Sequence, residues 1–119
     1  MIVMVTGGRN FDDRAEVVRR LKPYRKSGNI LLSGGATGAD KLCEIVWGGS
    51  WELPYVVMPA AWKRAGRAAG PMRSRTLIVG NALAPHAVLK PDVLVVFAGD
   101  RGTAQAIRFA KENGVDIDR

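Results

Sequence analysis

The amino-acid sequence predicts an α/β fold, namely a single Rossmann-like, three-layer domain over residues 1–119 with a mostly parallel sheet of about five strands. Two observations lead to this prediction. Short, continuous apolar runs, which are typical of strands buried on both faces, alternate with segments that have helical spacing. Glycine and proline mark most of the boundaries between them. Strands that alternate with helices need right-handed crossovers, which give a parallel sheet covered on both faces.

The first predicted strand, Ile2–Val5, leads into a pair of glycines and then into a helix. Asp12 or Asp13 can cap this helix, because a short carboxylate side chain accepts hydrogen bonds from the first free backbone N–H groups. The helix carries its apolar residues on one face and is expected to end near Pro23. A second strand is predicted over 29–32.

The second predicted helix runs from Ala39 to Trp47, and Gly48-Gly49 is expected to stop it. Gly114 is expected just after the end of the last helix. The remaining predicted elements are a strand over 54–58, a helix from about 72 to 83, a strand over 92–97, a helix over 102–113 and a short strand over 115–117.

Composition narrows the class of protein. The chain has 119 residues, 47% of them hydrophobic and 24% charged, as in a soluble globular protein. One cysteine and one histidine exclude a disulfide framework, a cysteine zinc site and a histidine cluster, so no metal site is predicted. No segment resembles a signal peptide or a membrane span, which predicts a cytoplasmic protein without membrane contact. Cys43 is expected to be a core thiol.

Three glycine clusters follow three predicted strands, where ligands bind in parallel sheets. They are Gly7-Gly8, Gly34-Gly35-x-x-Gly38 and Gly99-x-x-Gly102. The second cluster joins a strand directly to a helix, so that backbone N–H groups can converge on a phosphate or carboxylate. The alternative is that these glycines only permit tight strand–helix turns. In the loop of the third cluster, Thr103 is placed to cap a helix or to contact an anion.

The positive charge of +7 is unevenly distributed. The segment 61–75 has no acidic residue and carries +5, and its basic residues are Lys63, Arg64, Arg67, Arg73 and Arg75. Arg73 is predicted to bind an anion, whereas Trp62 can stack on a base or fill the core. A second basic group lies on the first helix and its exit, and is expected to be a solvated face. Its members are Arg14, Arg19, Arg20, Lys22, Arg25 and Lys26.

With these motifs, the chain resembles the SLOG superfamily, the Rossmann-like group that unites the SMF/DprA DNA-processing proteins with the LOG nucleotide hydrolases. It is most similar to the small YspA/YpsA-related (YAcAr) branch. Four ordered motifs carry the resemblance: Val5-Thr6-Gly7-Gly8-Arg9-x-Phe11, Gly34-Gly35-Ala36-x-Gly38-Ala39-Asp40, Ala69-Gly70-Pro71-Met72-Arg73 and Gly99-x-x-Gly102-Thr103-Ala104.

The resemblance implies binding of a nucleotide or nucleotide-derived phosphate ligand, such as a mononucleotide or an ADP-ribose-like molecule. LOG-like hydrolysis of nucleoside monophosphates is one alternative, with Asp40 or Asp100 as candidate catalytic residues, because the glutamate of the LOG motif is Ala106 here. DprA-like binding of single-stranded DNA is the other alternative. The expected ligand-binding residues are Gly7, Gly8, Arg9, Gly34, Gly35, Thr37, Gly38, Asp40, Arg73, Gly99, Arg101, Gly102 and Thr103.

Cofactors and assembly can also be predicted. No cofactor is evident, and Mg²⁺ is expected only together with a bound nucleotide. Because related folds commonly dimerise, a homodimer or larger homo-oligomer is expected.

Overall fold

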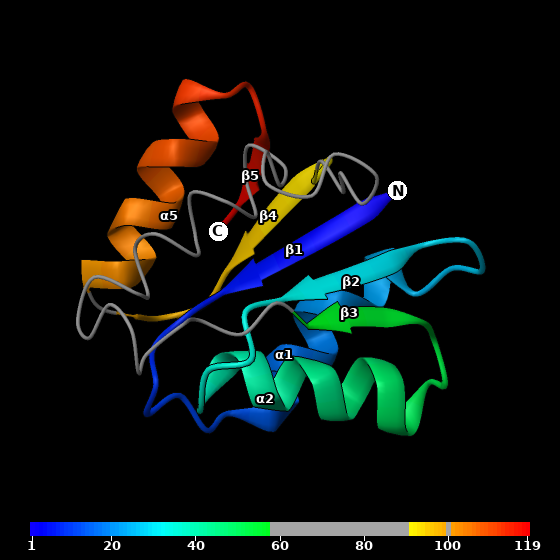
Figure 1. The fold of residues 1–119 in the computed structure, drawn as a ribbon. Helices are drawn as coiled ribbons and strands as arrows, with labels where there is room; N and C mark the ends of the chain where they lie inside the picture. Colours follow the sequence, from blue (N-terminus) through cyan, green and yellow to red (C-terminus); the bar gives the residue numbers. More distant parts are fainter. Residues whose placement is uncertain (58–90, 100) are drawn as a thin grey trace.

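A five-stranded sheet forms the centre of the protein in the computed structural model, which describes residues 1–57, 91–99 and 101–119 (Figure 1). The strands are β1 (Ile2–Thr6), β2 (Ile30–Ser33), β3 (Tyr55–Val57), β4 (Val93–Val96) and β5 (Asp116–Asp118). Their order is β3-β2-β1-β4-β5, and every neighbouring pair is parallel. The predicted α/β class with a parallel sheet of five strands is therefore confirmed.

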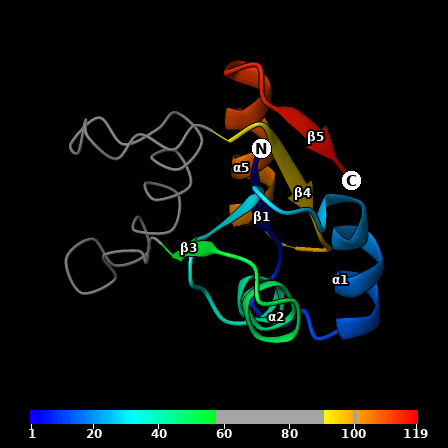
Figure 2. The ribbon, with the colours of Figure 1, turned by 90° about the vertical axis from the view of Figure 1, so that its right-hand side faces the viewer.

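Helices cover both faces of this sheet (Figure 2). On one face lie α1 (Arg14–Leu21), the short 3₁₀ helix η1 (Lys22–Tyr24), α2 (Ala39–Glu44) and the π-helix η2 (Ile45–Ser50). On the other face lies α5 (Arg101–Glu112). No helix within the described ranges is long and apolar enough to cross a lipid bilayer.

Strand β1 divides the core into two layers. Val3 and Val5 point to the side of α1 and α2, where they pack with Val17 and Trp47. Met4 points to the opposite side and packs in a second cluster that contains Ala106 of α5. Because successive side chains of a strand alternate between faces, one continuous apolar run supplies both layers.

The sequence offers two candidate caps for α1, and the structure distinguishes them. Asp13, rather than Asp12, caps the helix, and its Oδ1 accepts a hydrogen bond of 3.1 Å from the backbone N–H of Glu16. Pro23 lies within η1, two positions after Leu21, the last residue of α1, in agreement with the expected end near this proline.

The expected stop of the second helix at Gly48-Gly49 is wrong. The helix continues as η2 to Ser50, and the backbone N–H of Trp51 donates to the carbonyl of Val46 over 3.0 Å, the i→i+5 bond of a π-helix. A Cβ on Gly48 would overlap the ring of Tyr55 from β3. The glycine therefore permits close helix–strand packing instead of ending the helix.

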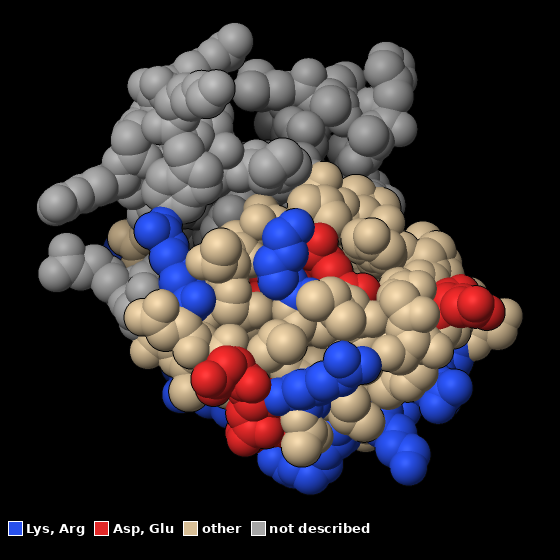
Figure 3. Space-filling view, turned by 90° about the horizontal axis from the view of Figure 1, so that it is seen from below, with Lys and Arg blue, Asp and Glu red and all other residues tan. Residues whose placement is uncertain are grey.

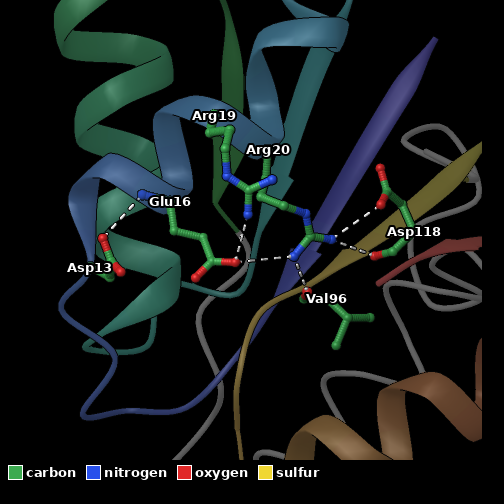
Figure 4. Close-up of polar contacts among 6 residues, drawn as sticks. All are labelled: Asp13, Glu16, Arg19, Arg20, Val96 and Asp118. Atoms are coloured by element: carbon green, nitrogen blue, oxygen red, sulfur yellow. Dashed lines mark hydrogen bonds and ion pairs between the residues drawn. The ribbon is translucent and has the colours of Figure 1, made fainter.

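Arg20 differs most from the expectation that the basic residues of α1 form a solvated face. Its side chain is only 12% exposed. The guanidinium donates to the backbone carbonyl of Val96 at 2.9 Å and to the carbonyl and carboxylate of Asp118 at 3.0 and 3.1 Å (Figure 4). It also lies 5.2 Å from the ring centroid of Phe97. The Arg20 side chain of α1 therefore forms hydrogen bonds with the last residues of both β4 and β5.

Several predicted features lie outside the described residues. They are the helix at about 72–83, the basic segment 61–75 with Trp62 and Arg73, and Asp100.

Replacing Arg20 with methionine is expected to destabilise the protein by roughly 2–4 kcal/mol, because it leaves two carbonyls and the Asp118 carboxylate without their cation. Urea denaturation followed by circular dichroism measures the change. Arg19→Met is the matched control: Arg19 is 70% exposed and, among the described residues, pairs only with Glu16, so its loss should cost less than about 1 kcal/mol. Equal losses in the two variants would contradict the assigned role of Arg20.

Tyr24 gives the fold a pH dependence at alkaline pH. Burial, followed by a 2.6 Å hydrogen bond from its hydroxyl to Asp118, raises the pKa of Tyr24 from 10.0 to about 12. Between these two values the unfolded chain loses the phenol proton and the native protein keeps it, so stability is full below pH 10 and falls as pH rises towards 12. Denaturation at pH 8 to 11 should show a shallower decline for Tyr24→Phe than for the native chain. Parallel pH profiles would contradict this.

Candidate functional site

Three loops meet around Gly8 at the carboxyl edge of the sheet. The backbone N–H of Gly8 donates to the carbonyl of Ala98 over 2.8 Å. The carbonyl of Gly8 accepts hydrogen bonds from the N–H groups of Phe11, at 3.2 Å, and Ala39, at 3.1 Å. The structure therefore brings the loops that follow β1, β2 and β4 into direct contact, as parallel strands require of their carboxyl ends.

The glycines make this contact sterically possible. A Cβ on Gly7 would lie 2.5 Å from the Cβ of Ala39 and 3.0 Å from the Cβ of Phe97. Gly38 has a φ of 83°, and a Cβ there would overlap the backbone of Gly8 and Arg9. Gly7 and Gly38 therefore have a packing role, whatever else the loops bind.

Buried polar side chains fix the loop between β2 and α2. The Ser33 hydroxyl accepts from the N–H of Gly35 at 3.2 Å and donates to the Glu44 carboxylate at 2.9 Å. The Asp40 carboxylate accepts from the N–H of Ala36 at 3.2 Å. Asp40, a predicted ligand-binding residue and a candidate acid or base, thus holds the loop in its observed shape.

Ser33 and Glu44 are site residues that the sequence analysis missed. Glu44 follows Asp40 by one helical turn, so a pair of acidic residues four positions apart indicated that both face the same loop. The Nζ of Lys41 lies 3.6 Å from Oε1 of Glu44, the carboxylate oxygen that Ser33 does not contact, and balances its charge. Burial, and then the nearby Asp40 and Glu44 carboxylates, raise the pKa of the Cys43 thiol. Cys43 is fully buried, as expected of a core thiol.

The first turn of α5 holds a buried hydroxyl that has no hydrogen-bond partner among the described residues. Thr103 is 6% exposed, and its Oγ1 forms no hydrogen bond within the described part of the chain. This side chain lies against Gly99, where a Cβ would overlap it and would stand 2.9 Å from the N–H nitrogen of Gly8. Thr103 is also in the first turn of the twelve-residue helix α5, where backbone N–H groups lack intrahelical acceptors.

The other predicted site residues are distributed as follows. Arg9 and Thr37 are exposed in the loops that meet around Gly8, whereas Gly34 is buried. Arg101 and Gly102 begin α5. Arg73 and Asp100 lie outside the described residues. Within the described ranges, no three His, Cys, Asp or Glu side chains are grouped so that they could hold a metal ion.

Comparisons with known proteins found one similarity in sequence and one in fold. The model of the YspA, cpYpsA-related SLOG family matches residues 1–65, which contain the loops after β1 and β2. Among solved structures, the chain is similar to DNA processing protein A from Helicobacter pylori, described for its single-stranded DNA binding mode, with a TM-score of 0.69 and 15% sequence identity. The match covers 98% of this chain and 63% of that protein's chain. No curated protein matches the sequence significantly.

Replacing Gly38 with alanine tests the close packing of the loops. The variant should lose roughly 2–4 kcal/mol of stability, because it adds left-handed strain to an overlap with the backbone of Gly8 and Arg9. Gly28→Ala is the matched control, since Gly28 has a similar φ of 91° but open space around it, and should cost about 1 kcal/mol. Denaturation midpoints that fall equally in both variants would show that the loops do not need this approach.

Proposed function

The chain belongs to the YspA, cpYpsA-related SLOG family, and we propose that it binds a nucleotide or nucleotide-derived phosphate ligand at the carboxyl edge of its sheet. The proposed ligand class is a mononucleotide or an ADP-ribose-like molecule. The proposed site lies where the loops after β1, β2 and β4 meet, next to the first turn of α5.

The observation that carries this proposal is the buried hydroxyl of Thr103, which has no hydrogen-bond partner in the described part of the chain. A buried polar group without a hydrogen bond costs about 1–3 kcal/mol, so such groups are uncommon in native proteins. A phosphate oxygen beside Gly99 would accept the missing hydrogen bond and would also lie at the positive end of α5. The same ligand would therefore satisfy the Thr103 hydroxyl and interact favourably with the helix dipole of α5.

The neighbouring loops limit which groups can contact this ligand. The N–H of Gly8 already donates to Ala98, and the N–H of Ala36 already donates to Asp40. We therefore assign the phosphate to the first turn of α5, with Arg9 supplying positive charge from the same edge. Arg73 and Arg101 remain predicted ligand residues, and Mg²⁺ would arrive only with a nucleotide.

Binding is favoured over hydrolysis of the ligand. Ala106, which occupies the position of the LOG glutamate, is fully buried in the core cluster with Met4 and Leu94. A carboxylate in that position would have to enter an apolar layer. Of the two candidate catalytic residues, Asp40 is engaged with the N–H of Ala36, and Asp100 lies outside the described residues.

Contact with single-stranded DNA is a second candidate function. The fold shared with DNA processing protein A favours it, because that protein is described for a single-stranded DNA binding mode. The basic residues of α1 and η1 favour it as well, since affinity for a nucleic acid depends on the number of phosphates that Lys and Arg neutralise. The homodimer or larger homo-oligomer stays a prediction.

Thr103→Val tests the proposed phosphate site with two effects of opposite sign. Removing the unpartnered hydroxyl should stabilise the ligand-free protein by about 1 kcal/mol, whereas affinity for AMP or ADP-ribose should fall about tenfold. Thermal shift without ligand and with each nucleotide measures both. At a ligand concentration near one hundred times Kd, the native protein should gain about 2.7 kcal/mol.

Thr103→Ser keeps the hydroxyl and is the matched control, so it should keep the ligand-induced shift. If the native chain responds to neither nucleotide nor inorganic phosphate, or if Thr103→Val retains the full shift, the proposal is wrong.

A further inference from the structure

The segment Arg14–Lys26 carries as much positive charge as the glycine-interrupted segment 61–75. It contains six of the 18 Lys and Arg residues and one acidic residue, and so contributes +5 to a net charge of +7. Figure 3 shows Lys and Arg side chains along the lower border of the molecule, on the side of α1. The charges of this segment differ in whether they form ion pairs within the protein.

Two of the six cations form ion pairs with residues in the described ranges. Arg20 fastens β4 and β5, and Arg19 pairs with Glu16 at 3.1 Å. Glu16 also lies 3.9 Å from Arg20, so the single acidic residue of the segment is shared by these two arginines. The other four cations are Arg14, Lys22, Arg25 and Lys26; all are exposed, and none forms an ion pair with a residue in the described ranges.

Two of these four are oriented by neighbouring groups. The guanidinium of Arg14 donates to the hydroxyl of Ser50 at 3.0 Å, and the guanidinium of Arg25 lies 5.1 Å from the ring centroid of Trp51. Trp51 in turn packs against the buried Trp47, with ring centroids 6.1 Å apart. A guanidinium stacked on an aromatic ring keeps its N–H edge available for a bidentate contact with phosphate.

The four cations are too widely spaced to serve the proposed nucleotide site. Helix α1 runs from the carboxyl edge of the sheet towards the opposite edge, because it connects the parallel strands β1 and β2. Arg14 begins α1 and Lys22 follows its last residue, and the eight positions between them correspond to about 12 Å along the helix. A stacked nucleic acid strand advances about 3.4 Å per nucleotide, so this length matches several nucleotides rather than one.

From this placement we infer that Arg14, Lys22, Arg25 and Lys26, together with Trp51, form a contact surface for the phosphate backbone of a single-stranded nucleic acid. The inference rests on the second candidate function and gives it a place on the molecule, separate from Thr103. Charge that the fold does not neutralise binds phosphates, and the aromatic ring among the cations favours a single strand, whose bases are free to stack.

The test compares two triple variants with the same change in net charge. In Lys22→Gln/Arg25→Gln/Lys26→Gln the surface loses three cations. In the control, Arg108→Gln/Lys111→Gln/Arg119→Gln, three exposed cations outside the surface are lost. Fluorescence anisotropy with a labelled 20-nucleotide oligo-dT, at several NaCl concentrations between 50 and 200 mM, gives the affinity and its salt dependence.

The surface variant should bind the oligonucleotide roughly ten- to a hundredfold more weakly at 100 mM salt. The slope of log K against log[NaCl] should become shallower by about 2, because each lost contact with a single strand contributes about 0.7. The control should change neither quantity appreciably. Both variants should keep the native thermal shift with AMP, which shows that they are folded.

Four outcomes would overturn the inference, and they differ in what they leave standing. Equal weakening in both triple variants would mean that only the net charge matters. Loss of oligonucleotide binding in Thr103→Val, with no effect of the surface variant, would place the strand at the carboxyl edge and keep the second candidate function. Tighter binding of a blunt 20-base-pair duplex would exclude a surface built for single strands. If the native chain does not bind oligo-dT, the second candidate function is wrong as well. The thermal shift with AMP would still test the first function, nucleotide binding.

Discussion

The rest of the candidate site depends on the backbone hydrogen bonds of Gly8. Gly8 binds the loop after β4 through its N–H group and the first residue of α2 through its carbonyl. These bonds form only because no side chain stands between the three loops at Gly7, Gly38 and Gly99. The shape of the carboxyl edge is therefore set by missing Cβ atoms as much as by any attractive contact.

This constraint changes the meaning of the high glycine content. Glycine-rich loops suggest backbone N–H groups that await a phosphate, but several donors in these loops already have acceptors within the protein, at Ala98, Ser33 and Asp40. The hydroxyl of Thr103 is different, because it is buried and has no acceptor in the described residues. The glycines thus shape the edge, and among the described residues an unsatisfied hydroxyl lies in the first turn of α5.

Within the described residues, the sequence predicts the strands, most of the helices and the parallel sheet, because continuous apolar runs and glycine boundaries are local patterns. It does not predict the extension of α2 into η2, because the fit of Gly48 against the ring of Tyr55 is a tertiary contact. The solvent exposure expected for Arg20 is wrong for a similar reason. Its position in a basic helix indicates an exposed side chain, whereas its hydrogen-bond partners lie 76 and 98 residues away in the sequence. The meeting of the glycine loops is predictable from the parallel topology, but which of their donors are already bonded is not.

The separation between Arg20 and its partners also has a consequence for the order of folding. Contacts between residues far apart in the chain form only after a long loop has closed, and such closure is slow. Helix α1 and the two strands beside it can assemble from the first third of the chain, but the guanidinium of Arg20 stays in water until β4 and β5 arrive. Arg20 therefore leaves water and packs between Phe97 and Asp118 only when β5, the edge strand next to β4, has joined the sheet.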